Sequence, residues 1–285
     1  MLFSNIDVFP SDWMTIFYLA ITGVLIGIFH RNLARWYIYL FVRVGIILGI
    51  LSLSFVTKPL PTVFQWLRDW YPIATIPIFY WEVAPLTQMI FRGYLDDQIV
   101  RWEDRLFKGQ PSVDLSTRFP SIVLSEFLHL CYFSYYAIVV FLAAVLYFQG
   151  KYQAFHEAVF AEIFTFNACL IWYIFMPVAG PRYDFEKIKG TLANGFFYRL
   201  THAILSRASS RGTAFPSSHA AIAMIALLCA ARYDLMSFAI LFPFCTGLVI
   251  GTVYGRFHYA IDAVAGSVLA FLIFGIAPTV YQWLL

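Results

Sequence analysis

Charged residues are scarce in this 285-residue sequence. Asp, Glu, Lys and Arg together make up 12% of it, whereas 61% of the residues are hydrophobic. A water-soluble domain carries about 25% charged residues. The composition therefore excludes an ordinary soluble protein and indicates a chain that lipid solvates.

Cysteines with metal-binding spacing are also missing. The four cysteines lie far apart in apolar stretches, at Cys131, Cys169, Cys229 and Cys245. Without a CxxC or mixed Cys/His spacing, the sequence predicts neither a zinc site nor a disulfide framework. We expect these side chains to be small buried hydrophobes.

Long apolar runs are abundant instead. A run of about 18 or more apolar residues is typical of a membrane-spanning helix. Seven segments qualify, at about 13–29, 36–57, 121–148, 156–178, 216–232, 236–254 and 258–284. The sequence therefore predicts an all-α, polytopic membrane helix bundle of about seven spans.

A further apolar stretch, Tyr71–Phe91, contains Pro72, Pro77, Pro85 and Glu82. Each proline removes a backbone donor, and lipid cannot replace the lost hydrogen bonds. We therefore expect this stretch to be re-entrant or to lie at the membrane interface, and not to span.

Basic residues in short loops indicate the cytoplasmic side of a membrane. The loops at 30–35, 149–155 and 232–236 carry Arg31, Arg35, Lys151 and Arg232. With seven spans these three loops share one side. The N-terminus is then predicted to lie outside and the C-terminus inside.

The long segment from Gly180 to Ala214 is basic. Its cations are Arg182, Lys187, Lys189, Arg199, Arg207 and Arg211. Loops of this length are usually functional or disordered, and a basic loop beside a membrane suits an anionic substrate. The alternative is a generic solvated loop.

Two histidines stand at predicted helix starts. Pro216-Ser217-Ser218-His219 precedes an apolar run, and proline followed by serine is typical of a helix N-terminus. His258 and Asp262 open the last apolar run and are four residues apart, so they share one helix face. A carboxylate on one ring nitrogen would leave the other nitrogen free to attack.

The predicted topology brings these segments together. Two spans lie between His219 and His258, so both histidines are expected at one side of the membrane. The span before Gly180-Pro181-Arg182 ends on that side as well. Helix N-termini and an arginine favour a bound phosphate.

These segments resemble the type 2 phosphatidic acid phosphatase superfamily, whose second motif is Pro-Ser-Gly-His and whose third is Arg…His-x-x-x-Asp. Pro216–His219 matches the second motif with Ser218 in place of Gly, and His258-x-x-x-Asp262 matches the third. The resemblance implies a six-helix core, here with one extra N-terminal helix. It also implies His258 as nucleophile, Asp262 as its orienter and His219 as general acid, with Ser217, Ser218 and Arg182 on the phosphate.

Three departures concern the phosphate contacts. Thr252 stands where the third motif has its Arg. The first motif is a Lys…Arg-Pro segment; here Phe175 stands in place of its Lys, and Pro181 precedes Arg182 instead of following it. Arg256, two residues before His258, or Arg211 from the basic loop would have to supply the missing charge.

Scattered residues upstream resemble the branch of inositol phosphorylceramide synthases, among them Trp102-Glu103 and Ser125-Glu126…His129…Tyr132. Glu126 and His129 share a helix face. They could hold a head-group hydroxyl, or they could be a satisfied polar pair inside the bundle.

The sequence thus predicts a lipid phosphatase or phosphotransferase that forms a phosphohistidine on the non-cytoplasmic face. We expect one domain, with N-terminal spans at 1–57, an outer segment at 58–120 and the catalytic bundle at 121–285. Membrane lipids and a phospholipid or lipid-phosphate substrate would be its partners, with no nucleic acid and no metal or other cofactor. The alternatives are a transferase that moves a phospho-head group to a lipid hydroxyl, and a lipid transporter or scramblase with a degenerate site.

Overall fold

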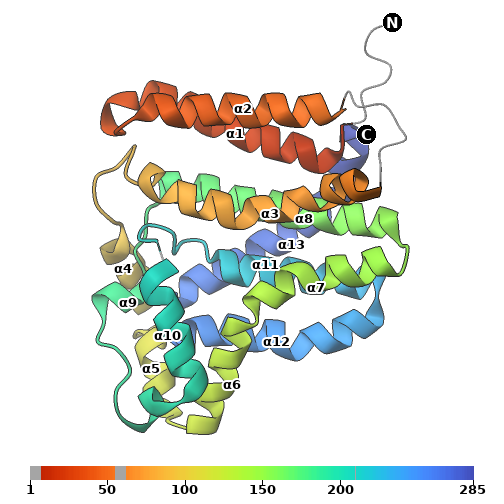
Figure 1. Cartoon of the computed structure of the whole chain (residues 1–285). Helices are drawn as coiled ribbons and strands as arrows, with labels where there is room; N and C mark the ends of the chain where they lie inside the picture. The colour runs from red at the N-terminus through yellow and green to blue at the C-terminus, as the bar shows by residue number, and fades with distance from the viewer. Residues whose placement is uncertain (1–7, 55–61, 209) are drawn as a thin grey trace, which may run out of the picture.

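The computed structural model describes residues 8–54, 62–208 and 210–285, and its regular structure is entirely helical (Figure 1). The long helices are α1 (Pro10–Ile28), α2 (Trp36–Ser54), α3 (Thr62–Leu86), α7 (Tyr135–Phe148), α8 (Tyr152–Phe175), α11 (Ser218–Tyr233), α12 (Leu235–Tyr254) and α13 (Ala260–Leu284). The shorter ones are α4 (Asp96–Phe107), α5 (Pro111–Arg118), α6 (Ile122–Phe133), α9 (Pro181–Asp184) and α10 (Phe196–Ala208). The predicted all-α class is confirmed.

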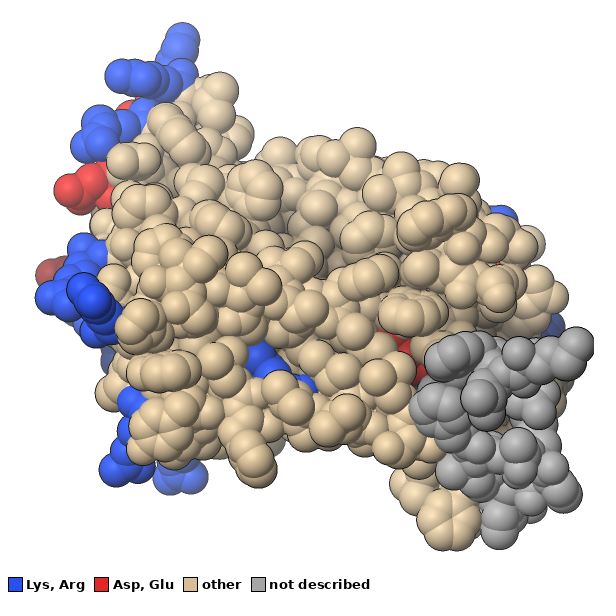
Figure 2. All heavy atoms as spheres, turned by 90° about the horizontal axis from the view of Figure 1, so that it is seen from above, with Lys and Arg blue, Asp and Glu red and all other residues tan. Residues whose placement is uncertain are grey.

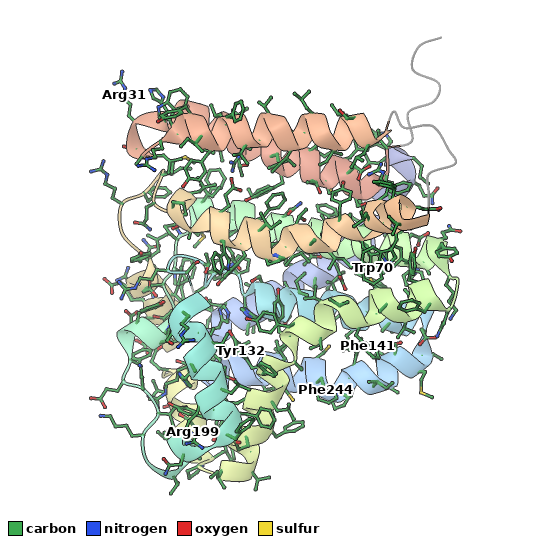
Figure 3. The ribbon with its side chains drawn as sticks, in the orientation of Figure 1. Arg31, Trp70, Tyr132, Phe141, Arg199 and Phe244 are labelled. Carbon is green, nitrogen blue, oxygen red and sulfur yellow. The ribbon has the colours of Figure 1, made fainter. Side chains whose placement is uncertain are left out.

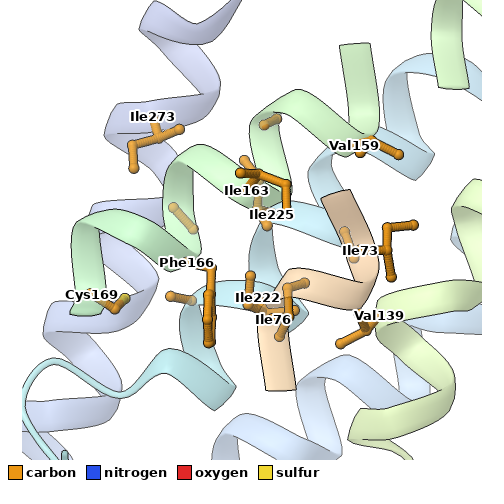
Figure 4. Close-up of a cluster of buried hydrophobic side chains, with 14 of the residues drawn as sticks. Ile73, Ile76, Val139, Val159, Ile163, Phe166, Cys169, Ile222, Ile225 and Ile273 are labelled. Atoms are coloured by element: carbon orange, nitrogen blue, oxygen red, sulfur yellow. The ribbon is translucent and has the colours of Figure 1, made fainter. Parts of the chain in front are cut away.

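The core lies between α8 and α11, where branched side chains interdigitate. Ile163 and Phe166 of α8 meet Ile222 and Ile225 of α11, and Ile273 of α13 packs nearby (Figure 4). All five side chains are buried. Because α11 is rich in alanine, its neighbours approach its backbone closely, as is common between membrane helices.

In its described part, each of the seven predicted segments contains helix, but two of them differ from a simple span. Among the described residues, five helices are long and apolar enough to cross a membrane, or six if the bent pair of α6 and α7 counts as one span. That pair bends by 53°. α11 has 16 residues and is about 24 Å long at 1.5 Å per residue, shorter than the roughly 30 Å hydrocarbon core.

Over 71–86 the structure has a continuous helix and no re-entrant turn, and this helix is not among those long and apolar enough to cross a membrane. Pro72, Pro77 and Pro85 lie within the continuous helix α3, which packs against α8 and α1. Neighbouring helices make prolines tolerable because they shield the freed backbone groups from lipid. Two charged residues of α3, Arg68 and Glu82, are paired as well.

Two buried ion pairs join the first three helices. Arg68 of α3 binds Asp12 of α1, with 2.6 Å between Nη2 and Oδ2. Arg43 of α2 binds Glu82 of α3, and it also donates to the Thr22 hydroxyl. Pairing lowers the cost of charge in a low-dielectric environment.

Four short helices, α4, α5, α9 and α10, gather at one end of the bundle, here called the loop end (Figure 1). Lys and Arg side chains are concentrated at this end (Figure 2). Figure 3 labels Arg31 and Arg199 there and Trp70 toward the opposite end.

α3 runs along the bundle from one end to the other (Figure 1), and this changes where the loops on either side of it lie. Asn32, after α1, donates to the carbonyl of Met89, after α3, so the loop at 30–35 lies at the loop end. The loop of Lys151 lies at the opposite end, where Lys151 pairs with Asp234. The three basic loops therefore do not lie at one end of the bundle. The start of α1 and the end of α13 both lie at the end opposite the loop end (Figure 1), whereas the seven-span prediction put the two chain ends on opposite sides of the membrane.

Cysteine labelling in sealed vesicles tests this arrangement. The four native cysteines are all buried and unpaired, so we expect little labelling of the unmodified chain. With a membrane-impermeant maleimide, we expect Arg31→Cys and Arg118→Cys to react from the same side and Gln153→Cys from the other. Reaction of Arg31→Cys together with Gln153→Cys would restore the seven-span arrangement and overturn the one described here.

Candidate active site

His258 lies in the turn between α12 and α13, at the loop end. Its Nδ1 is 3.0 Å from the carbonyl oxygen of Ala214 and 3.6 Å from Oδ2 of Asp262. A carbonyl oxygen only accepts, so Nδ1 carries the proton and Nε2 keeps its lone pair. Burial lowers the pKa of His258 to about 4, which leaves the ring neutral at pH 7.

Asp262 lies in the first turn of α13, but its hydrogen bond is not to His258. Oδ2 accepts from the backbone N–H of Tyr259 at 2.9 Å, which caps the helix. No described residue provides a hydrogen-bond partner for Oδ1. The Ala214 carbonyl, which sequence reasoning missed, is therefore the group that holds the His258 tautomer, and Asp262 adds a negative charge beside the same nitrogen.

His219 lies in the first turn of α11, as predicted. Its Nδ1 is 3.5 Å from Nε2 of His258, and its Nε2 is 3.2 Å from the hydroxyl of Tyr132. The two histidines, 39 residues apart in sequence, thus face each other at helix starts.

Ser217 and Ser218 build the start of α11. The Ser217 hydroxyl caps the helix by accepting from the amide of Ala220, and the Ser217 amide donates to the backbone carbonyl of Asp262. The Ser218 amide donates to the hydroxyl of Tyr173. Both serines are buried, and neither belongs to the described residues that line the cavity below. Their contacts hold the helix start in place.

A small cavity of about 30 Å³ connects the two histidines to Arg182. Its wall is largely aromatic, with Tyr80, Tyr132, Tyr183 and Phe257 beside His219 and His258. Arg182 reaches it because the chain turns sharply at Gly180, which has φ +99°. A Cβ there would be 3.2 Å from the carbonyl oxygen of Phe257, so glycine fits this turn.

The two arginines considered for the missing charge are placed differently. Arg211 stacks its guanidinium 4.3 Å above the ring of Tyr183, a residue of the cavity wall. Arg256 binds the carbonyl of Glu186 and, at 3.1 Å, the hydroxyl of Ser116. Arg211 therefore lies beside the cavity, whereas Arg256 braces α5.

Glu126 and His129 do not line the cavity either. The Glu126 carboxylate accepts from the amides of Phe197 and Tyr198 at 2.9 and 3.0 Å, so it caps α10. His129 donates from Nδ1 to the carbonyl of Ser125 and packs on Phe257. Both oxygens of the Glu126 carboxylate therefore have backbone partners, and its predicted contact with a head group stays a prediction.

Sequence reasoning missed two buried carboxylates of α4. Asp96 accepts from the amides of Ala179 and Gly180, both at 2.8 Å, and Glu103 accepts from the amide of Ile261 at 3.2 Å. Burial raises the pKa of Asp96 and raises that of Glu103 to about 7. Their spacing of seven puts both on one helix face, and that was the available signal.

Comparison with known proteins identifies a family over this region. A family model described as the PAP2 superfamily matches residues 97–276, well over half of the chain. Searches of curated proteins and of solved structures found no match. In the described part of the chain, no three His, Cys, Asp or Glu side chains are grouped to hold a metal ion.

The protonation of His258 can be measured directly. We expect its ring to titrate near pH 4 and to stay neutral above that, because burial disfavours the imidazolium. Nitrogen-15 spectra of the detergent-solubilised protein, with His258→Gln to assign the signal, give the titration. A midpoint near the ordinary histidine value of about 6.5 would contradict the buried environment.

Asp96→Asn should destabilise the Gly180 turn. An asparagine amide would face backbone N–H donors, leaving at least one unpaired at a cost of about 1–3 kcal/mol. Thermal unfolding of the solubilised protein measures the loss. Asp97→Asn, its exposed neighbour, is the matched control. Equal stability of the two variants would argue against the Asp96 contacts.

Proposed function

Because the chain belongs to the PAP2 superfamily, we propose that it is a membrane-embedded lipid phosphatase or phosphotransferase acting through a phosphohistidine on His258. The superfamily match supports a phosphatase- or phosphotransferase-type function. One observation carries the finer proposal: the free Nε2 of His258 and Nδ1 of His219 are 3.5 Å apart, in a cavity that Arg182 also lines.

In the first step, Nε2 of neutral His258 attacks phosphorus in line, and the bond to the leaving oxygen breaks. The Ala214 carbonyl holds the proton on Nδ1, and Asp262 stabilises the positive charge that develops on the ring. His219, protonated beside the phosphate anion, gives its Nδ1 proton to the leaving alcohol. Such proton transfer contributes about 10²–10⁴ in rate.

In the second step, His219 takes a proton from the acceptor hydroxyl, whose oxygen attacks the phosphohistidine and releases His258. Arg182 supports the phosphate oxygens through its planar guanidinium, and Arg211 is the proposed substitute for the missing arginine. The N-terminus of α11 adds partial positive charge, positioned by Ser217 and Ser218.

A second candidate, transfer to a lipid hydroxyl, is supported by the enclosure of the site. His258 is 4% exposed and aromatic rings form much of the cavity wall. A phosphohistidine needs shelter from water if another alcohol is to accept the phosphoryl group. An inositol phosphorylceramide synthase-like reaction would fit this requirement.

Lipids labelled in the head-group phosphate test the proposal. Purified protein would be incubated with them, with and without a ceramide or diacylglycerol acceptor. Free labelled phosphate supports a phosphatase, and a new labelled lipid supports a transferase. Absence of both products from a folded protein, across lipid monoesters and diesters, would overturn the proposed activity.

Histidine variants test the assigned roles. We expect His258→Ala to abolish turnover and protein-bound label, and His219→Ala to lower kcat by about 10²–10⁴. His202→Gln, a histidine outside the cavity wall, is the control and should retain activity. Full activity of His258→Ala would show that the nucleophile is another group.

A further inference from the structure

Tyr132 of α6 makes a second kind of contact with the histidine pair. Its hydroxyl is 3.2 Å from Nε2 of His219, and the two rings are stacked with centroids 4.9 Å apart and planes 20° apart. Tyr132 is 6% exposed and lines the cavity. Figure 3 labels it in the region where α6 approaches α11.

The two nitrogens of His219 therefore have different partners. Nδ1 faces Nε2 of His258 and the cavity, whereas Nε2 faces the Tyr132 hydroxyl. A tyrosine hydroxyl can accept as well as donate, so it can bind a protonated Nε2. Which ring nitrogen exchanges protons is set by the hydrogen bond that the other nitrogen makes.

We propose that Tyr132 is a positioning residue for proton transfer: its hydroxyl oxygen accepts the Nε2–H of His219 and keeps Nδ1 as the nitrogen that exchanges the proton. This inference rests on the proposed function. It assigns a role to a residue that contacts His219 from outside the motifs of the two histidines.

The proton balance closes around this contact. Protonated His219 starts with a proton on each nitrogen, and the Nδ1 proton leaves with the departing alcohol as the His258–phosphorus bond forms. The remaining proton stays on Nε2, held by Tyr132, so the Nδ1 lone pair faces the cavity. It then takes the proton of the acceptor hydroxyl when the phosphohistidine is attacked, and His219 is again doubly protonated.

Without the Tyr132 hydroxyl, the neutral ring can carry its proton on either nitrogen. The tautomer with the proton on Nδ1 cannot act as base in the second step. Loss of the hydroxyl also removes one stabilising contact of the imidazolium needed in the first step. Both effects slow proton transfer. The phenylalanine of Tyr132→Phe can still stack on the His219 ring.

Tyr135 offers a matched control on the same histidine. Its ring contacts His219 with centroids 4.4 Å apart. Among the described side chains, the hydroxyl at hydrogen-bonding distance from Nε2 is that of Tyr132. Tyr132→Phe and Tyr135→Phe therefore remove the same atom type near the same ring, with and without the hydrogen bond.

The experiment compares two phosphate esters of different leaving groups. For an alkyl lipid phosphate, whose leaving alcohol needs a proton, Tyr132→Phe should lower kcat/KM about 10-fold or more, up to the full contribution of about 10²–10⁴ that acid–base catalysis makes. For p-nitrophenyl phosphate, whose leaving group needs no proton, kcat/KM of Tyr132→Phe should stay within about threefold of the unmodified value. Because the second step is slowed, nitrophenolate should appear in an initial burst. Tyr135→Phe should change neither pattern.

Two outcomes separate the inference from the proposed function. If His219→Ala lowers kcat/KM for the alkyl ester no more than for the aryl ester, His219 is not the general acid, and the proposed mechanism is wrong. If His219→Ala shows the leaving-group dependence but Tyr132→Phe behaves as Tyr135→Phe does, the role of Tyr132 is wrong and the mechanism stands.

Discussion

The site depends on the close contact between the starts of α11 and α13. The Ser217 amide donates to the Asp262 carbonyl, and a Cβ on Gly266 would collide with the Ser217 carbonyl oxygen. Glycine thus permits an approach that other residues would prevent. This contact brings together two histidines that the chain separates by 39 residues, and the cavity lies beside them.

Buried acids of α4 hold the other two segments against this contact. Asp96 ties the Gly180 turn to the Tyr259 hydroxyl, and Glu103 caps the start of α13. A buried carboxylate is costly unless donors surround it, and here backbone amides supply them. The charged helix is therefore the scaffold that connects the arginine segment with the histidine segments, and the family match begins within it.

The sequence was sufficient to predict the helical class, a helix N-terminus at Ser217 and the proximity of His219 to His258. These follow from the length of apolar runs and from residues typical of helix starts, which are local signals. It was insufficient for α3, since whether three prolines break a helix depends on the neighbours α1 and α8. It also missed the Ala214 carbonyl, because a backbone group carries no signal in residue identity. The Arg43–Glu82 pair likewise requires knowing that α2 and α3 are adjacent.

α3 also contributes a residue to the site. Tyr80 of α3 forms part of the cavity wall and contacts the Thr213 hydroxyl at 3.2 Å. α3 lies outside residues 97–276, so the family region alone does not complete the cavity. The buried pairs of Arg68 with Asp12 and of Arg43 with Glu82 fix the position of α3 along α1 and α2, since breaking a buried pair leaves an uncompensated charge. The N-terminal helices thus position one wall of the cavity beside the two histidines.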